Sequence, residues 1–141
     1  FEHRMGLTEN LDPCKFFDKD VWWRGIADFV AVDGETALLV DYKTGKSAKF
    51  ADTHQLQLLS LALFAHFKEL KRIRSGLLFL VSKEFVSVTY TRDEIESGWE
   101  HWNKDVNRLK ISIESDVWNP SENFTCRNWC AVTDCEYNGN N

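Results

Sequence analysis

Two carboxylates and an ammonium in the first half of the chain have residue types and a spacing that suit metal-dependent hydrolysis. Asp28, Asp41 and Lys43 are polar exceptions in a segment rich in β-branched and aromatic residues. Asp41 and Lys43 are two residues apart, so on a β-strand their side chains project from the same face. Mg²⁺ prefers oxygen ligands and keeps several waters, so one or two carboxylates suffice to hold it. A neighbouring ammonium can orient the attacking water and offset charge that develops on a phosphate. These residues therefore predict a phosphodiester hydrolase site.

A second interpretation of the same residues stays open at this point. Asp28 and Asp41 could be residues of strand ends or sheet edges that face water, with Lys43 as their surface ion pair. An Asp-x-Lys triplet is common by chance, so spacing alone does not separate the two interpretations.

The elements that would position the three residues begin with a β-hairpin. Residues 22–32 and 35–42 are rich in strand-forming residues. Asp33-Gly34 lies between them and is a dipeptide typical of the type I′ turn. The preceding residues 1–19 show no sustained period and are expected to be a lead-in with a short strand.

Helices and further strands follow the hairpin. Asp52 and Gln55 have the side chains of a capping box, and apolar residues then recur every three or four positions, which predicts a helix to about Lys71. Residues 76–81 and 85–91 predict a second hairpin. Thr91 and Glu94 form another predicted capping box before a second amphipathic helix that ends near Ser112. The first helix is long enough to connect two parallel strands.

This element order predicts an α/β fold with a mixed β-sheet flanked by helices. The chain has 141 residues, of which 43% are hydrophobic, and this length predicts a single domain over residues 1–141. Residues 114–141 are expected to form an irregular tail that contains cysteines. The chain begins with Phe1 and has no apolar run long enough to span a membrane, so we expect a segment of a longer or processed protein with no membrane partner. The net charge of −5 argues against a non-specific nucleic-acid coat.

Three short motifs in this order resemble those of the RecB-like branch of the PD-(D/E)XK nucleases. They are Gly25-Ile-Ala-Asp28, Asp41-Tyr-Lys43 and Gln55-Leu-Gln-Leu-Leu59. The tail from Trp118 to Cys135 is similar to the tails of phage and bacterial exonucleases of this branch, so the resemblance covers nearly the whole chain. It implies a restriction-endonuclease-like core.

The resemblance also implies roles for individual residues. Asp28 and Asp41 would bind Mg²⁺ or Mn²⁺, the carbonyl of Tyr42 would add a ligand, and Lys43 would position the water. Gln55 would help to order the site and the DNA end, although its place in the capping box offers a structural explanation.

Two departures from the family pattern concern the third motif and the upstream helix. Leu59 stands where the third motif usually has Tyr. The His or Glu that many members carry on a helix upstream of the first motif has no clear match in this chain.

The four cysteines support several interpretations. Cys126, Cys130 and Cys135 are dense enough for metal ligation, and Cys14 could supply a fourth thiolate. In relatives of this branch, one N-terminal and three C-terminal cysteines hold a [4Fe–4S] cluster, which makes an iron–sulfur cluster a candidate cofactor. Free thiols or disulfides are the alternatives, and an intracellular nuclease disfavours disulfides.

Lys46 and Lys49 lie in the link between the hairpin and the first helix and are candidate phosphate contacts, or else residues of a solvated loop.

The resemblance predicts a cytoplasmic, metal-dependent deoxyribonuclease that acts on DNA ends in phage or bacterial recombination, with DNA and a recombination or single-strand-binding protein as partners. A DNA-binding or assembly module that retains the nuclease fold is the alternative. A third is a small structural metal-binding domain defined by its cysteines.

Overall fold

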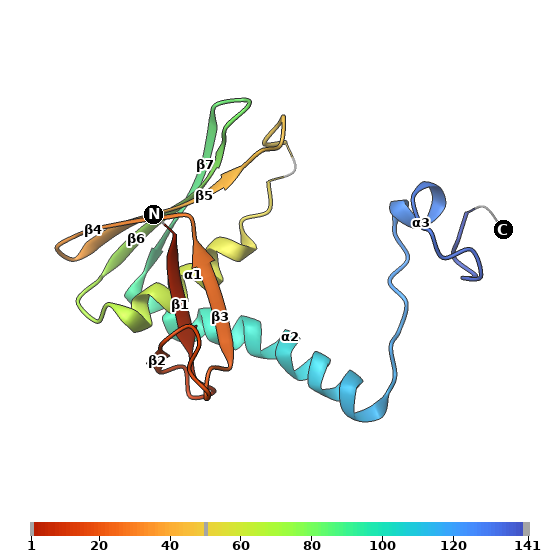
Figure 1. The fold of residues 1–141 in the computed structure, drawn as a ribbon, viewed down its shortest axis with the longest axis horizontal. Helices are drawn as coiled ribbons and strands as arrows, with labels where there is room; N and C mark the ends of the chain where they lie inside the picture. The colour runs from red at the N-terminus through yellow and green to blue at the C-terminus, as the bar shows by residue number, and fades with distance from the viewer. Residues whose placement is uncertain (1, 50, 140–141) are drawn as a thin grey trace. The chain divides into compact units, whose positions relative to one another are not determined.

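Seven strands form two β-sheets in the computed structural model, which describes residues 2–49 and 51–139 (Figure 1). The smaller sheet has the strand order β2-β1-β3 and is antiparallel. Its strands are β1 (His3–Leu7), β2 (Pro13–Cys14) and β3 (Trp23–Ala27). The predicted lead-in is therefore a structured part of the molecule, because its β1 pairs along its whole length with β3.

The larger sheet is mixed and has the strand order β4-β5-β6-β7. Its strands are β4 (Phe29–Asp33), β5 (Thr36–Lys43), β6 (Arg72–Phe79) and β7 (Glu84–Thr91). Strands β5 and β6 are parallel and are connected through α1 (His54–His66), as the length of the predicted helix required. The predicted α/β class with a mixed sheet and flanking helices is confirmed.

The strand predicted over residues 22–32 is interrupted at Asp28. Strand β3 ends at Ala27 because it pairs with β1 up to the register His3 to Ala27, whereas Phe29 begins β4 and pairs with Val40 of β5. Asp28 is a bend between these two strands. The chain thus leaves one sheet and enters the other at the first predicted site residue.

The predicted hairpin of β4 and β5 is confirmed, but its turn lies one residue later. Asp33 pairs with Thr36, so the loop residues are Gly34 and Glu35. The Thr36 hydroxyl donates to the Asp33 carbonyl over 3.0 Å and closes this pair. Gly34 has a φ of 54°, and Asp33 and Glu35 do not adopt positive φ, so the predicted type I′ turn is wrong.

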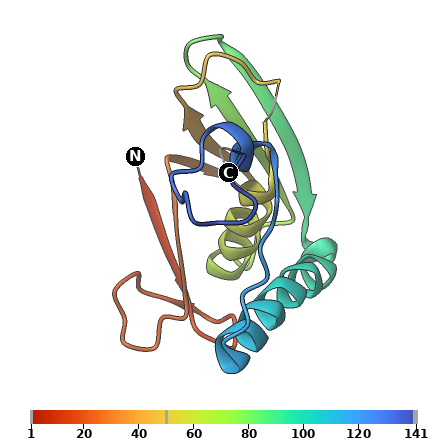
Figure 2. The same cartoon turned by 90° about the vertical axis from the view of Figure 1, so that its right-hand side faces the viewer.

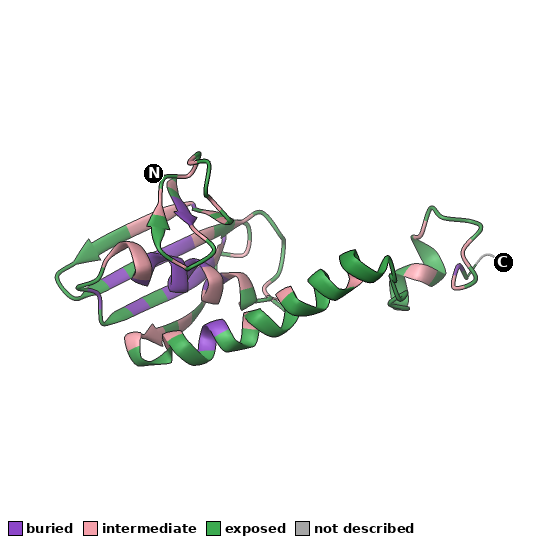
Figure 3. Ribbon diagram, turned by 90° about the horizontal axis from the view of Figure 1, so that it is seen from below, coloured by how far each residue is buried: buried purple, intermediate pink, exposed green. Residues whose placement is uncertain are grey.

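Helix α1 lies between the two sheets and contacts β1 and β3 on one side and β6 and β7 on the other (Figure 2). Figure 3 shows buried positions along α1 and the strands of the larger sheet. The core combines apolar side chains of both sheets with those of α1. Its largest fully buried apolar members are Met5, Leu7, Leu39, Leu56, Leu63, Phe64, Leu70, Ile73 and Leu77.

Helix α1 ends at His66, five residues before the predicted end. The Arg92 guanidinium donates from Nη2 to the carbonyls of Phe67 (2.7 Å) and Phe64 (3.2 Å). The backbone N–H of Lys71 donates to Glu35 of the first hairpin over 2.7 Å. The terminal carbonyls of the helix are therefore satisfied by a side chain, and the chain turns early into β6, which starts at Arg72.

The second capping box is present as predicted at the end of β7. Glu94 Oε2 accepts hydrogen bonds from the N–H (2.6 Å) and hydroxyl (2.9 Å) of Thr91. A 3₁₀ turn, η1 (Arg92–Glu94), leads into α2 (Ile95–Ser115), which continues three residues beyond the predicted end.

The residues divide into two compact units, one up to Asn103 and one from Lys104. In the second unit the tail predicted to be irregular contains a short helix, α3 (Phe124–Asn128), whose cap Asn123 accepts a hydrogen bond from the Thr125 N–H over 2.9 Å. In residues 2–49 and 51–139, no helix combines the length and the apolar character needed to cross a membrane.

Candidate active site

Asp28 is fixed beside β5 by its own carboxylate. Its Oδ2 accepts a hydrogen bond from the backbone N–H of Tyr42 over 2.7 Å. The last paired residues of β4 and β5 are Phe29 and Val40, so this bond extends the contact between the strands beyond their ladder. It places Asp28 next to the Asp41-Tyr-Lys43 motif despite the separation in sequence.

Asp41 and Lys43 lie near the end of β5, and their side chains form an ion pair. Lys43 Nζ is 2.7 Å from Asp41 Oδ2, and the side chains are 34% and 16% exposed, respectively. The two charged atoms are close, but the angles between the Lys43 ammonium and the Asp41 carboxylate do not satisfy hydrogen-bond geometry. Within the described residues, Asp41 Oδ2 is buried and accepts no hydrogen bond. The alternative of a fully solvated surface pair does not fit this burial.

Gln55 is directed to the same pair from the first turn of α1. Its Oε1 accepts a hydrogen bond from Lys43 Nζ over 3.1 Å. The predicted capping box with Asp52 is wrong: the helix begins after Thr53, no side chain caps it, and Asp52 Oδ1 instead accepts from the N–H of His54 over 2.9 Å. The N–H of His54, and then its ring, lower the pKa of Asp52.

The side chains of Asp28, Asp41 and Lys43 meet at the end of β5. They form an oxygen-rich site with a net charge of −1, from two carboxylates and one ammonium. A hard divalent cation requires such oxygen ligands. The buried Asp41 Oδ2 accepts no hydrogen bond and has the Lys43 ammonium as its ionic partner. The donor set of two carboxylates therefore fits a divalent metal ion.

The family of this chain follows from a comparison with known protein families. The chain matches the family model of the PD-(D/E)XK nuclease superfamily over residues 2–137. The chain belongs to this superfamily. A search of curated proteins gives no significant match.

Membership of the PD-(D/E)XK nuclease superfamily indicates a nuclease, which is a phosphodiester hydrolase, with nucleic acid as the substrate. Nucleases of this superfamily generally use divalent metal ions, in agreement with the donor set at the end of β5. The match also covers β1 to β3 and the second unit, although the predicted chemical motifs span only residues 25–59.

The departure at Leu59 has a structural explanation. Leu59 is 7% exposed and belongs to the core. A Cβ added at Gly25 would come within 3.0 Å of the Leu59 side chain and within 2.2 Å of the Trp23 ring. Gly25 of the first motif therefore leaves room for the Trp23 ring and for the Leu59 side chain of α1. Leu59 packs against β3 at this point.

The predicted phosphate contacts, Lys46 and Lys49, are exposed on the link after β5. This link is held to β7 by the Ala48 N–H, which donates to Glu84 Oε2 over 3.2 Å. The Ser47 hydroxyl accepts from the Lys49 N–H over 3.1 Å. The loop therefore has defined anchors beside the end of the strand that carries Asp41.

The structure identifies no metal centre among the cysteines of the described residues. All four are half-buried thiols, and Cys14 lies in the first unit whereas the other three lie in the second. In the described parts of the chain, no group of three or more His, Cys, Asp or Glu side chains has an arrangement that could hold a metal ion. Partial burial and the nearby Asp18 and Asp20 raise the pKa of Cys14, which disfavours the thiolate needed for ligation.

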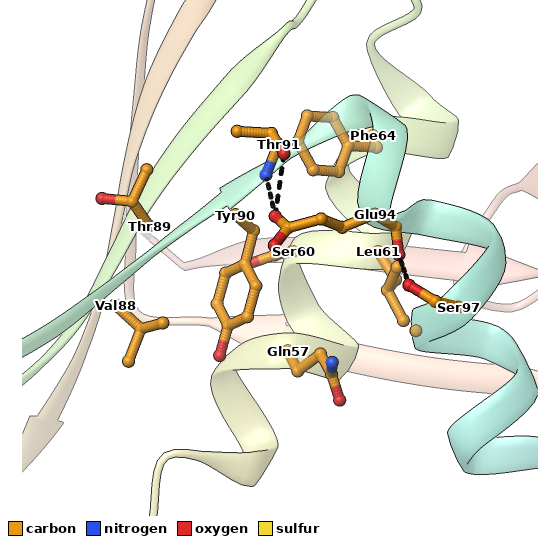
Figure 4. Close-up of a pocket in the computed structure, with 11 residues that line it drawn as sticks. Gln57, Ser60, Leu61, Phe64, Val88, Thr89, Tyr90, Thr91, Glu94 and Ser97 are labelled. Atoms are coloured by element: carbon orange, nitrogen blue, oxygen red, sulfur yellow. Dashed lines mark hydrogen bonds between the residues drawn. The ribbon is translucent and has the colours of Figure 1, made fainter.

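A pocket of about 170 Å³ lies elsewhere, between α1, β7 and the start of α2 (Figure 4). None of the site residues lines it. Its polar side chains serve the fold: Glu94 caps η1, the Ser97 hydroxyl donates to the Glu94 carbonyl over 3.0 Å, and Gln57 accepts from Trp102 over 3.0 Å. The pocket is therefore separate from the candidate site at the end of β5.

The sequence interpretation missed a group of arginine and phenylalanine side chains on the small sheet. It consists of Arg4, Phe16, Phe17 and Arg24. Adjacent phenylalanines in an aperiodic segment were the available signal, but the two arginines come from different strands, and only the pairing of β1 with β3 brings them together.

Proposed function

We propose that this chain is a Mg²⁺- or Mn²⁺-dependent deoxyribonuclease that hydrolyses phosphodiester bonds at DNA ends. The observation that carries the proposal is the convergence of Asp28, Asp41 and Lys43 at the end of β5, with a buried Asp41 oxygen that accepts no hydrogen bond. Membership of the nuclease superfamily supports it.

The carboxylates of Asp28 and Asp41 and the carbonyl of Tyr42 would hold the metal ion. A bound divalent ion supplies Lewis acidity and lowers the pKa of a bound water. The chain's own residues supply orientation: the Tyr42 N–H holds the Asp28 carboxylate beside β5, and the ladder with β6 fixes Asp41 opposite Leu77. Positioning of this kind reduces the reorganisation that the reaction would otherwise require.

Lys43 would orient the attacking water and stabilise negative charge on the phosphate. Its ammonium has three donors. One is directed to Gln55 Oε1, and Asp41 Oδ2 is in ionic contact. Gln55 is thus a positioning residue, since it holds Lys43 through a hydrogen bond and is itself held by the first turn of α1.

The finer assignment rests on the order of the three motifs. Gly25 to Asp28, Asp41 to Lys43, and Gln55 to Leu59 follow the pattern of the RecB-like branch, and the tail with Cys126, Cys130 and Cys135 resembles its exonucleases. We therefore place the protein in phage or bacterial DNA recombination, in the cytoplasm, beside a recombination or single-strand-binding protein. The iron–sulfur cluster is not part of this proposal, because no group of ligands supports it among the described residues.

The test is cleavage of labelled DNA by the purified chain in the presence and absence of Mg²⁺. We expect linear duplexes and single-stranded tails to be shortened from their ends, and covalently closed circles to stay intact. Cleavage of circles at the same rate would replace the exonuclease assignment with an endonuclease. DNA binding without cleavage in Mg²⁺ or Mn²⁺ would instead favour the non-catalytic module.

A further inference from the structure

A group of two arginines and two phenylalanines lies on the small sheet and on the loop after β2. Arg4, Arg24 and Phe17 are exposed, and Phe16 is half-buried. Arg24 Cζ lies 5.7 Å from the centre of the Phe16 ring and 5.9 Å from that of Phe17. Arg4 Cζ lies 5.8 Å from the Phe16 ring, and the two rings meet edge to face at 5.0 Å. We call these four residues the Arg–Phe cluster.

The Arg–Phe cluster is not part of the hydrophobic core. Phe17 is 73% exposed, and neither phenylalanine packs against the core residues. The loop is nevertheless held in place, because the Lys15 N–H donates to Asp18 Oδ2 over 2.8 Å and the Asp18 N–H donates to the Lys15 carbonyl over 3.1 Å. An exposed ring on a fixed loop is available for stacking at a small entropic cost.

The positive charge of the cluster comes from its own two arginines. Over residues 2–24 the four cations, Arg4, Lys15, Lys19 and Arg24, are opposed by five carboxylates, those of Glu2, Glu9, Asp12, Asp18 and Asp20, so the segment as a whole carries −1 and a phosphate contact depends on Arg4 and Arg24. Glu2 lies 3.6 Å from Arg4, and both side chains are more than half exposed, which makes the pair weak and easily replaced by a phosphate.

Strand β3 leads from the cluster to the candidate active site. Arg24 and Ile26 are exposed on one face of β3, and Asp28 follows two residues later. At about 3.3 Å per residue, the chain from Arg24 to Asp28 spans at most about 13 Å, because Asp28 lies in the bend after β3. A DNA strand bound at the cluster could therefore also reach the residues at the end of β5.

We propose that the Arg–Phe cluster binds single-stranded DNA, with a base stacked on Phe17 and the backbone held by Arg4 and Arg24. Aromatic rings bind unstacked bases irrespective of sequence, and arginines contribute phosphate and cation–π contacts. In a duplex the base faces are covered by their neighbours, so the cluster favours single strands. This inference deepens the proposed function, on which it rests, by assigning a single-stranded substrate to the site.

The experiment is a titration of fluorescent oligothymidylate of about 20 residues, followed by anisotropy in Ca²⁺ without Mg²⁺. The Phe17→Ala variant is expected to bind about tenfold more weakly than the wild type, since loss of one stacked base has an effect of this size. The matched control is Phe124→Ala, because Phe124 is 77% exposed but lies in the second unit. Its affinity should stay within about twofold of the wild type, as for other exposed sites.

Two further probes separate stacking from charge. An oligonucleotide with the same phosphates but no bases should bind the wild type and Phe17→Ala equally. Arg24→Gln should weaken binding to both oligonucleotides and reduce the salt dependence by a slope of about 0.7.

Equal affinity of Phe17→Ala and the wild type for oligothymidylate would overturn the inference, and so would no binding of oligothymidylate by the wild type. Binding does not require cleavage, so the outcome is distinct from that of the proposed function. If the wild type binds oligothymidylate through Phe17 but does not cleave DNA, only the nuclease proposal is contradicted.

Discussion

The end of β5 and the cysteine-containing second unit are both candidates for metal binding, and they differ in how their polar side chains are held. At the end of β5, Asp28 and Gln55 come from other elements and meet Asp41 and Lys43 through the N–H of Tyr42 and the ammonium of Lys43. In the second unit the ligating residue types are dense in sequence. Among the residues described, neither region holds a group of three or more His, Cys, Asp or Glu side chains that could bind a metal ion, so the two regions differ in the contacts that join their polar side chains.

The residue that organises the end of the second unit is not a cysteine. Asn138 is 4% exposed, and its side chain donates to the carbonyls of Val132 (2.8 Å) and Cys130 (3.2 Å). The backbone around the cysteines is thus held by an amide. The comparison teaches that convergence of strand ends joins candidate ligands that are far apart in the sequence, whereas density of ligand types along the sequence does not by itself join them.

The largest expected effect comes from Asp41→Asn, which keeps the shape of the side chain but removes its charge. Cleavage in Mg²⁺ should fall by about a thousandfold or more, because the metal ion supplies several kcal/mol of transition-state stabilisation. The comparison variant replaces Cys126, Cys130 and Cys135 by Ser and should keep its activity within about twofold. Equal losses in the two variants, measured as initial rates on one substrate, would reverse the comparison.

Lys43→Met should reduce cleavage by about a hundredfold to a thousandfold, since a fixed charge that meets the developing charge of a phosphate has an effect of this size. The apolar stem is kept, so the thermal midpoint should change little. Single-turnover rates at saturating Mg²⁺ measure the effect. Activity similar to that of the wild type would leave Lys43 only as a partner of Asp41.

Gln55→Ala should have a smaller effect, about tenfold in rate, because Gln55 acts through Lys43 by one hydrogen bond. Its effect should largely disappear in the Lys43→Met background, as a double-mutant cycle would measure. The free energy of unfolding should change by less than about 0.5 kcal/mol, because Gln55 does not cap α1. Additive losses of rate would contradict a positioning role.

Charge reversal of Lys46 and Lys49 to Glu is expected to have the smallest effect. If the two lysines contact phosphates, the slope of DNA affinity against salt should decrease by about one to two units in Ca²⁺. Folding should be nearly unaffected, because both residues are exposed on a loop. An unchanged slope would move the path of the DNA away from this link.

The sequence predicted the main elements of the fold because their signals are local. Runs of β-branched and aromatic residues predicted the strands around Asp41, and the apolar stripe from Leu56 predicted the helix that connects parallel strands. Features that depend on tertiary pairing were missed. The break at Asp28 arises because β3 pairs with β1, and the early end of α1 arises because Arg92 binds its last carbonyls.

The candidate site follows the same division between local and tertiary signals. The same-face placement of Asp41 and Lys43 follows from strand geometry, whereas the capping box assigned to Gln55 fails because its amide binds Lys43 instead. The role of the cysteines stays a prediction, because ligand types that are close in sequence need not converge in space.

The central claim is that Asp28 and Asp41 form the metal site and that Lys43 lies beside it without being a ligand. Calorimetric titration with Mn²⁺ tests it directly on the wild type, Asp41→Asn and Lys43→Met. We predict binding to the wild type, loss of that binding in Asp41→Asn, and retained binding in Lys43→Met, because an ammonium has no lone pair for a metal ion. Unchanged Mn²⁺ affinity in Asp41→Asn, or equal loss in both variants, would contradict the account.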